Sequence, residues 1–333
     1  MSKLILKLLR YQVFKSSSCL VNFEMNNSKK RKIDENRSSL SSHIKRSRRT
    51  EPLPSSTTLF HQSFFDEKYK IAKEKEREFH DLNKDFVVPI TVPFLECIDV
   101  LTEFHYWLKV NREVLVCAFD IFYRYLAKCH TAISDYNKVI RVLSACTLLA
   151  EKFCGGDEGE LDIRDKILEK TNLDKKELAE AERQVLNGID YRINFWNCSY
   201  FIDYFAKLCN YGQESKEVSF AYLVFIAAQH SRKLQHAKHS LNAAASLAVA
   251  TEILAHSGSR GPLKRKRSDV KIFNASKVLA SSKEELAICK RTILKAMRRC
   301  KQSNVKVYRV LSRECGRADP VEVLEQLNKK QRV

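Results

Sequence analysis

Cysteine and histidine are the residue types in this sequence that could act as nucleophiles or hold a metal ion. The chain has eleven cysteines and nine histidines, but no two cysteines form a CxxC pair and no cysteine–histidine spacing matches a zinc site. His230, His236 and His239 lie near one another in the sequence without a second group of ligands beside them. Scattered cysteines at apolar positions are typical of free, buried thiols in a reducing compartment. We therefore expect no metal site and no other cofactor.

Motifs that mark enzymes are missing as well. The sequence contains no GxGxxG, P-loop, HExxH or GxSxG string, and no cysteine has neighbours typical of a catalytic nucleophile. Helical segments with neutral faces offer no evident substrate pocket. The chain is predicted not to be an enzyme, which leaves binding and regulation as the functions to consider.

The positive charge of the chain lies at its two ends. The formal net charge is +19, and residues 1–50 hold 13 Lys/Arg against 3 acidic residues. Residues 290–333 hold 13 Lys/Arg against 4, which leaves equal numbers of basic and acidic residues between the ends. A neutral middle argues against a nucleic-acid-binding core, although a basic end could still contact nucleic acid. No run of 18 apolar residues occurs, so no membrane span is predicted.

Residues 1–60 are rich in Ser, Lys and Arg and poor in aromatic residues, which predicts a disordered tail. Two basic clusters stand in it, formed by Lys29, Lys30, Arg31 and Lys32 and by Lys45, Arg46, Arg48 and Arg49. Clusters of this kind suit the acidic groove of a nuclear import receptor, so we expect a nuclear protein with such a receptor as partner. The leucine-rich, acid-free start faintly resembles a mitochondrial presequence, and either Met1 or Met25 could be the first residue.

The same tail contains a short string that resembles a degradation signal. Arg37 and Leu40 match the RxxL pattern of a minimal degradation box, which would make a ubiquitin ligase a partner. Such strings also arise often by chance, so solvated tail residues are the alternative interpretation. No Ser-Pro or Thr-Pro dipeptide occurs, and proline-directed phosphorylation is therefore not expected.

The scarcity of turn residues predicts an all-α fold. No proline occurs between Pro93 and Pro262, and all eight glycines lie at or after Gly155. After a charged lead-in helix at 61–92, amphipathic helices are predicted over 95–108, 113–129, 136–153 and 162–170. The third of these is apolar nearly all round, which indicates a central helix. Asp174 and Glu177 then form a capping box that begins a fifth helix.

The pattern recurs in the second half of the chain. Helices are predicted over 199–209, 216–233 and 240–256, then weakly at 269–280 after a basic insertion, and finally from a second capping box at 282–285. Small residues at Ala243–Ala245 mark another crowded central helix about a hundred residues after Ala145. We predict two consecutive five-helix bundles, at 93–196 and 197–300, with a basic C-terminal tail at 301–333.

Four motifs in the first bundle resemble the cyclin box. They are Glu113-Val114-Leu115, Phe122-Tyr123-Arg124-Tyr125-Leu126, Leu148-Leu149-Ala150-Glu151-Lys152-Phe153 and Glu182-Arg183-Gln184-Val185-Leu186, with Tyr191-Arg192-Ile193-Asn194 following. They stand in the family's order and at its spacings. The resemblance covers about 95–210 well and 211–300 by pattern only. It implies a regulatory subunit that binds and activates a cyclin-dependent kinase and contributes no catalytic group.

The resemblance also implies two kinase-binding residues, Lys152 and Glu182. In the family, a lysine and a glutamate at these places contact the mobile regulatory helix of the kinase. A lysine can donate to carbonyl groups at the end of that helix, and a carboxylate can accept from backbone N–H groups. Without the resemblance, both residues would be interpreted as ordinary solvated helix residues.

The sequence departs from the family at several places. Tyr123 replaces the acid of an acid–arginine pair whose Arg124 is retained, and Phe94 falls near the arginine that would partner the acid. In the substrate-docking patch the signature tryptophan falls on Val100, although Glu103 matches. Trp107, elsewhere on that helix, is expected in the core, so substrate docking through this patch is doubtful. These departures indicate a divergent branch. The fifth-helix stretch through Tyr191-Arg192-Ile193-Asn194, with Ala150-Glu151-Lys152, resembles cyclin-like proteins associated with meiotic crossover formation.

A DNA-associated scaffold of the same fold, acting without a kinase, is the alternative. Lys264-Arg265-Lys266-Arg267 and Arg298-Arg299 could form a basic face for nucleic acid. They are equally interpretable as solvated charges or as a second import signal.

Overall fold

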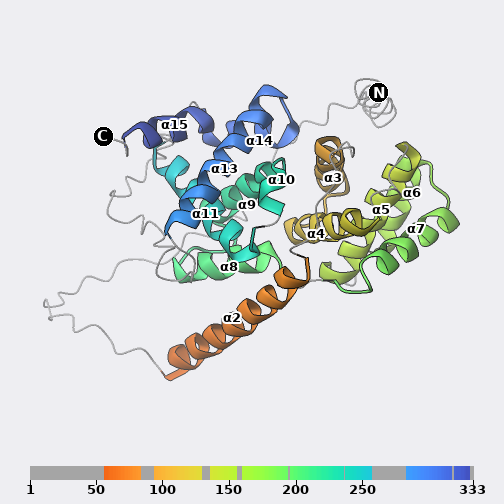
Figure 1. Ribbon diagram of the computed structural model, residues 1–333, viewed down its shortest axis with the longest axis horizontal. Coiled ribbons are helices and arrows are strands. Elements are labelled where there is room, and N and C mark those ends of the chain that lie inside the picture. Colours follow the sequence, from red (N-terminus) through yellow and green to blue (C-terminus); the bar gives the residue numbers. More distant parts are fainter. Residues whose placement is uncertain are drawn as a thin grey trace, which may run out of the picture.

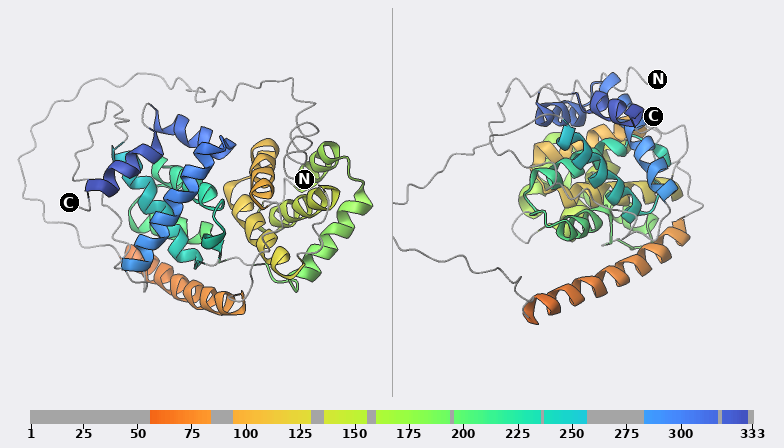
Figure 2. Two further views of the ribbon diagram at one scale, coloured as in Figure 1. Left: turned by 45° about the horizontal axis from the view of Figure 1, so that its top comes forward. Right: turned by 90° about the vertical axis from the view of Figure 1, so that its left-hand side faces the viewer.

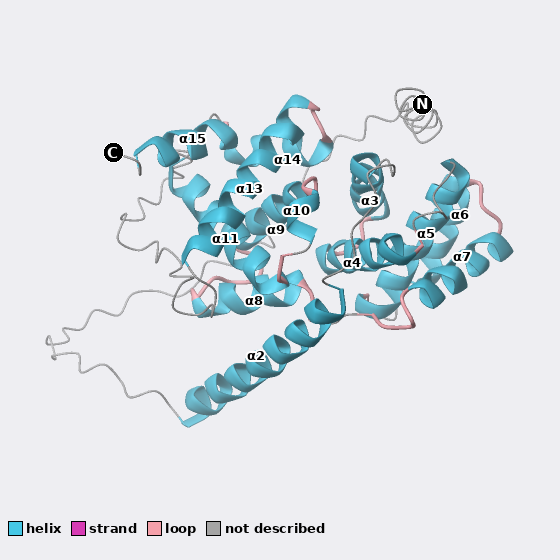
Figure 3. Cartoon of the chain, viewed as in Figure 1, coloured by secondary structure: helices cyan, strands magenta, loops and turns pink. Residues whose placement is uncertain are grey.

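The computed structural model describes residues 56–83, 94–129, 136–155, 160–193, 196–235, 237–256, 283–316 and 319–330. These ranges contain thirteen helices and no strand (Figure 3), which confirms the predicted all-α fold. The two basic clusters of the N-terminal tail, the RxxL string and the Lys264–Arg267 insertion lie outside the described residues. Figure 1 shows two helical bundles side by side with one long helix, α2, beneath them.

The first bundle consists of five helices packed around one of them. They are α3 (Phe94–Leu108), α4 (Arg112–Lys128), α5 (Tyr136–Cys154), α6 (Glu160–Thr171) and α7 (Lys175–Gly188). Helix α5 packs against the other four, and every residue from Val142 to Glu151 is buried. A helix that is apolar on every side needs neighbours on every side, so the predicted central position of this helix is confirmed.

The second bundle is built around α11 (His239–His256). Its neighbours are α8 (Cys198–Leu208), α9 (Lys216–Ala228) and α13 (Lys283–Gln302), and the short α10 (Arg232–Gln235) packs on α13. Ala243, Ala244 and Ala245 are completely buried, and such small side chains let α8 and α9 approach α11 closely. The bundle therefore repeats the plan of the first, with a small-residue helix at its centre.

The predicted basic tail at 301–333 is wrong, because two further helices lie there. They are α14 (Lys306–Cys315), which packs on α9 and α3, and α15 (Pro320–Lys330), which packs on α11 and α13. Their buried side chains are Val307, Tyr308, Leu311, Cys315, Val321 and Leu324. The summed positive charge of this segment hid apolar residues that recur at helical spacing, each of which gains free energy on burial.

Helix α2 (Ser56–Asn83) lies along the outer side of the bundles in both views of Figure 2. Tyr69 stacks on Tyr204 of α8 with ring centroids 4.3 Å apart. Glu76 is 2% exposed and accepts hydrogen bonds from the backbone N–H of Ser240 at 2.5 Å and from its hydroxyl at 2.8 Å. The expected solvated helix is thus attached to the start of α11, where a carboxylate also interacts favourably with the helix dipole.

Candidate functional site

The relative position of α5 and α7 is fixed at the start of α7. Asp174 accepts from the N–H of Glu177 at 2.7 Å, and Glu177 accepts from the N–H of Asp174 at 3.1 Å. The predicted capping box is therefore confirmed. Arg141 of α5 forms an ion pair with the same Glu177 carboxylate, so the cap that begins α7 also holds it against the central helix.

Lys152 and Glu182, thirty residues apart in the chain, meet on the outer surface of the first bundle. Lys152 Nζ donates to Glu182 Oε1 at 3.1 Å and to Oε2 at 2.9 Å. The Lys152 and Glu182 side chains are 29% and 13% exposed, so the pair is partly buried at the surface. A surface pair of this kind adds only about 0.2–1 kcal/mol to the stability of the fold, so exchanging it for contacts with a binding partner has a small cost.

An exposed phenylalanine follows Lys152 in the chain. Phe153 is 41% exposed, which is unusual for a phenylalanine in this fold. It lines a cavity of about 320 Å³ together with the half-buried Trp196 and Tyr200, and Lys68 of α2 lies at the same cavity. Aromatic and charged side chains that line one surface cavity are typical of a protein-binding surface.

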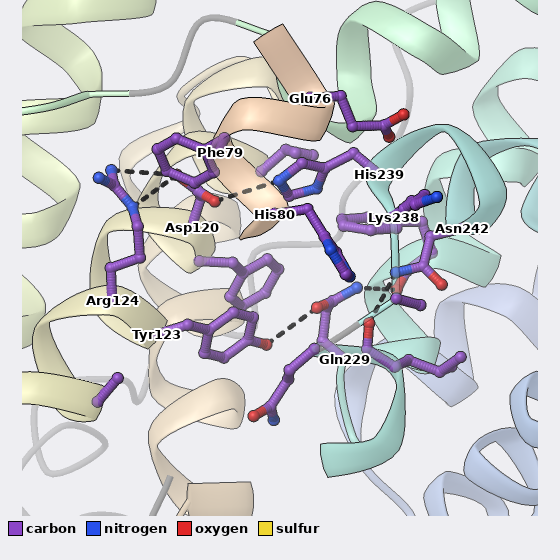
Figure 4. Close-up of a pocket in the computed structure, with 17 residues that line it drawn as sticks. Glu76, Phe79, His80, Asp120, Tyr123, Arg124, Gln229, Lys238, His239 and Asn242 are labelled. Atoms are coloured by element: carbon purple, nitrogen blue, oxygen red, sulfur yellow. Dashed lines mark hydrogen bonds and ion pairs between the residues drawn. The ribbon is translucent and has the colours of Figure 1, made fainter. Parts of the chain in front are cut away.

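Phe94 and Tyr123, where the sequence departs from the family pattern, form an aromatic contact in the structure. Their ring centroids lie 5.5 Å apart, and the Tyr123 hydroxyl donates to Gln229 Oε1 at 3.0 Å (Figure 4). Arg232 lies over the Phe94 ring, 5.6 Å from its centroid. An aromatic pair that also bonds to the second bundle replaces a charged pair, so no buried charge is left without a partner.

The retained Arg124 pairs within its own helix. Its Nη2 lies 3.1 Å from Asp120 Oδ2, and its guanidinium lies over the ring of Phe79 in α2. Asp120 also pairs with His239 of α11, 3.4 Å away, beside a cavity of about 220 Å³ (Figure 4). Burial alone would raise the pKa of Asp120, but Arg124 and His239 together lower it, so the carboxylate stays charged between the bundles.

The face of α3 expected to resemble a substrate-docking patch is partly covered by α14. Lys306 pairs with Glu103 at 2.7 Å and lies 4.8 Å from the centroid of the Tyr106 ring. Val100 and Trp107 are partly buried against the core, and Lys170 lies over the indole ring. The glutamate that matches the family pattern therefore already has a partner inside the chain.

The three histidines of the sequence do not come together as a metal site. His230 pairs with Asp99 at 2.9 Å, and His239 pairs with Asp120, while His236 lies outside the described residues. Within the described ranges no three metal-binding side chains gather, and all ten cysteines there are free. None of the helices in those ranges is long and apolar enough to cross a membrane.

Sequence reasoning missed three polar residues that join the parts of the molecule: Glu76, Asp120 and His239. Acidic residues and histidines in a helical pattern are assigned to solvent by default. The one available signal was the position of Asp120 on the apolar side of its helix, between Phe119 and Ile121.

Two helical bundles of one plan, with Lys152 and Glu182 in contact on the first, define the fold and the candidate site. Residues 92–194 match the family model of the cyclin N-terminal domain, so this part of the chain is a cyclin domain. Proteins of this family are regulators and not catalysts. Comparison with curated protein sequences gives no match.

Proposed function

We propose that this chain is a cyclin-type regulatory subunit that binds and activates a cyclin-dependent serine/threonine kinase through Lys152 and Glu182. The observation that carries the proposal is the meeting of these two side chains at an exposed surface of the cyclin N-terminal domain. A kinase helix end placed over the pair offers carbonyl groups to Lys152 and N–H groups to Glu182.

The exposed Phe153, next in the chain to Lys152, supports the same partner. Phe153 and the cavity bordered by Trp196 would bury apolar side chains of the kinase, which supplies binding free energy that two polar contacts alone do not. Holding the regulatory helix of a kinase in place orients the kinase's own Lys–Glu pair for phosphoryl transfer. The regulatory subunit thus acts by positioning the kinase helix and contributes no catalytic group.

Co-purification of the full chain with a panel of cyclin-dependent kinases tests the proposal. We expect the wild-type chain to capture a kinase and raise its activity toward a peptide. The double variant Lys152→Ala/Glu182→Ala should weaken binding roughly 100-fold, because two charge-assisted hydrogen bonds at about 1.5 kcal/mol each are lost.

The exposed ion pair Glu180–Arg183, on the same helix, provides the matched control. Glu180→Ala/Arg183→Ala removes a pair of the same chemistry and should leave kinase capture unchanged. Capture that survives the Lys152/Glu182 change would assign the kinase to another surface. Absence of capture by the folded wild-type chain would exclude the kinase function itself.

We further propose a nuclear location, import through Lys29–Lys32 and Lys45–Arg49, and turnover through the RxxL string at Arg37. The departures at Phe94, Tyr123 and Val100 support a divergent branch. The Ala150–Lys152 and Tyr191–Asn194 stretches, which resemble meiotic cyclin-like proteins, support a meiotic role. Neutralising both basic clusters should move a fluorescently tagged chain out of the nucleus. Depletion of the chain in meiotic cells should reduce crossover number; an unchanged number would exclude that branch.

A further inference from the structure

Helix α13 has two opposite faces. Cys289, Ile293, Met297 and Cys300 are buried against the second bundle, where α13 contacts α9 and α11. Arg291, Lys295 and Arg299 are exposed, and they follow one another at intervals of four residues. Four residues of an α-helix rise about 6 Å and turn about 40° beyond a full turn, so the three cations form a slanted row about 12 Å long.

The other cations of α13 are neutralised by acidic side chains. Lys290 pairs with Glu252 of α11, Arg298 pairs with Glu325 of α15 at 2.7 Å, and Lys301 pairs with Asp319 at 3.1 Å. No acidic side chain of the described residues pairs with the three cations of the row; Arg291 Nε donates to the carbonyl of Ala287. The fold thus separates neutralised cations from a row of uncompensated ones. Of the Arg298-Arg299 pair that the sequence suggested as part of a basic face, only Arg299 belongs to this row.

The spacing of the row is unfavourable for the helix itself. Like charges four residues apart repel, and α13 has no acidic residue after Glu285 that could relieve them. An anionic partner that contacts all three would remove this repulsion. The row also lacks the exposed aromatic anchors that dominate protein–protein interfaces, since its one large apolar neighbour is Ile288 at one end.

We propose that Arg291, Lys295 and Arg299 form a binding face for the phosphate backbone of nucleic acid. Lysine and arginine contacts to phosphates supply sequence-independent affinity through the release of counterions. An evenly spaced row of long cationic side chains fits a polymer that carries one charge per residue. The face contacts phosphates and reads no base sequence.

The face lies away from the Lys152–Glu182 surface. Helix α13 is on the second bundle, whereas α5 and α7 belong to the first (Figures 1 and 2). Both surfaces are therefore accessible at once. A kinase regulator of this design would be held at nucleic acid while its partner is bound at the other bundle, and neither interaction depends on the other.

Fluorescence anisotropy of a labelled 30-base-pair DNA duplex of arbitrary sequence tests the proposal, with the full chain and a salt series from 50 to 200 mM. The variant is Arg291→Gln/Lys295→Gln/Arg299→Gln. Each lost phosphate contact lowers the slope of log affinity against log salt by about 0.9, so the slope should fall by about 2.7. Affinity at the low-salt end should drop roughly tenfold or more.

The control variant Lys70→Gln/Lys175→Gln/Lys176→Gln removes the same charge from three exposed lysines on α2 and α7. This variant distinguishes the effect of losing the row from the effect of losing three positive charges anywhere in the chain. The distinction matters because the basic N-terminal residues also attract DNA. We expect its slope to stay within about 0.5 of wild type, since only distant charge is lost. Equal losses in the two variants would overturn the proposal.

A poly-glutamate peptide of 20 residues serves as the competing polyanion. If it binds as tightly as DNA and loses affinity equally in the row variant, the face accepts acidic protein and the nucleic-acid assignment is wrong. Kinase capture by the row variant should equal that of wild type, and the Lys152/Glu182 variant should bind DNA normally. Failure of one proposal is therefore distinguishable from failure of the other.

Discussion

Phe94 and Tyr123 pack against each other, with ring centroids 5.5 Å apart, at the two positions where the cyclin resemblance places an arginine and an acid. Phe94 is 1% exposed, so the replacement lies inside the protein. The contact between the two positions is kept while its chemistry changes. A buried ion pair and an aromatic pair are interchangeable only when both members change together.

A double-mutant cycle tests this coupling. Phe94→Arg alone should destabilise the protein by about 3–5 kcal/mol, because it buries a cation without a partner near Arg232. Tyr123→Asp alone also loses the hydrogen bond to Gln229. The double variant should be more stable than the sum predicts by at least about 1 kcal/mol, measured by urea unfolding. Strict additivity would mean that the two positions do not interact.

Glu76 should contribute more to stability than any exposed acid of α2. Glu76→Ala leaves the Ser240 N–H and Lys73 without their common acceptor, and we expect a loss of about 3 kcal/mol in the free energy of unfolding. Hydrogen exchange of α2 amides should accelerate in the same variant. The control is Glu78→Ala, which removes a half-exposed pair with Lys75 and should cost less than about 0.5 kcal/mol. Similar costs for the two variants would contradict the buried contact.

The His230–Asp99 pair should make stability depend on pH. Burial favours the neutral ring, but hydrogen bonds with Asp99 and Cys300 outweigh it and raise the pKa of His230 to about 10. Because the folded-state pKa exceeds the unfolded value of about 6.5, this stabilisation is complete below pH 6.5 and is lost as pH rises toward 10. Between pH 7 and 9 the unfolding free energy of the wild type should fall by about 1 kcal/mol per pH unit relative to Asp99→Asn.

The comparison with Asp99→Asn matters because the cysteines of the unfolded chain also titrate in this range. Burial raises the pKa of Cys97 and of Cys289 to about 12, so their stabilising effect also declines with rising pH. Both variants share these thiols, and the difference isolates His230. Parallel pH profiles for wild type and Asp99→Asn would show that the imidazole is neutral in the folded protein.

The last two helices should be required for folding. A chain ending at Asn304 lacks the buried side chains of Val307, Tyr308 and Leu311 and exposes the surfaces of α9 and α11 that α14 and α15 cover. Each buried large side chain contributes about 1.5–3 kcal/mol, so the shortened chain should aggregate or lose cooperative unfolding. A chain ending at Lys330 should unfold like the wild type by circular dichroism. A stable, cooperative chain ending at Asn304 would contradict this prediction.

Most of the fold could be predicted from the helical periodicity and the capping motifs of the sequence. The helix from Lys175 was predicted from Asp174 and Glu177, whose hydrogen bonds are local and need no tertiary information. The prediction for the segment after Gln302 was wrong because net positive charge does not mean that a whole segment is solvated. In α14 the charges of Arg309 and Arg313 lie outside while Val307 and Leu311 lie inside, so periodicity, not net charge, was the informative signal.

The site was predictable only in part. Lys152 and Glu182 were assigned to kinase binding through a family resemblance. Their contact with each other was not predicted, since nothing local connects residues thirty positions apart. The attachment of α2 by Glu76 was not predictable, because a buried acid is recognised only when its distant donor, Ser240, is known. The row on α13 needed the structure as well: Arg298 and Lys301 are neutralised by Glu325 and Glu322 of α15, a helix absent from the sequence interpretation.

Two ion pairs connect α5 to α7, Arg141–Glu177 near the start of both helices and Lys152–Glu182 at the far end of α5. Only the second faces the proposed partner. In the proposed complex, Lys152 and Glu182 would give up their contact with each other and bind groups of the kinase, while the first pair and the capping box still hold the two helices at the same angle. The kinase would then dock on a rigid surface that loses little conformational entropy on binding. We therefore expect fast association, limited by the rate of encounter.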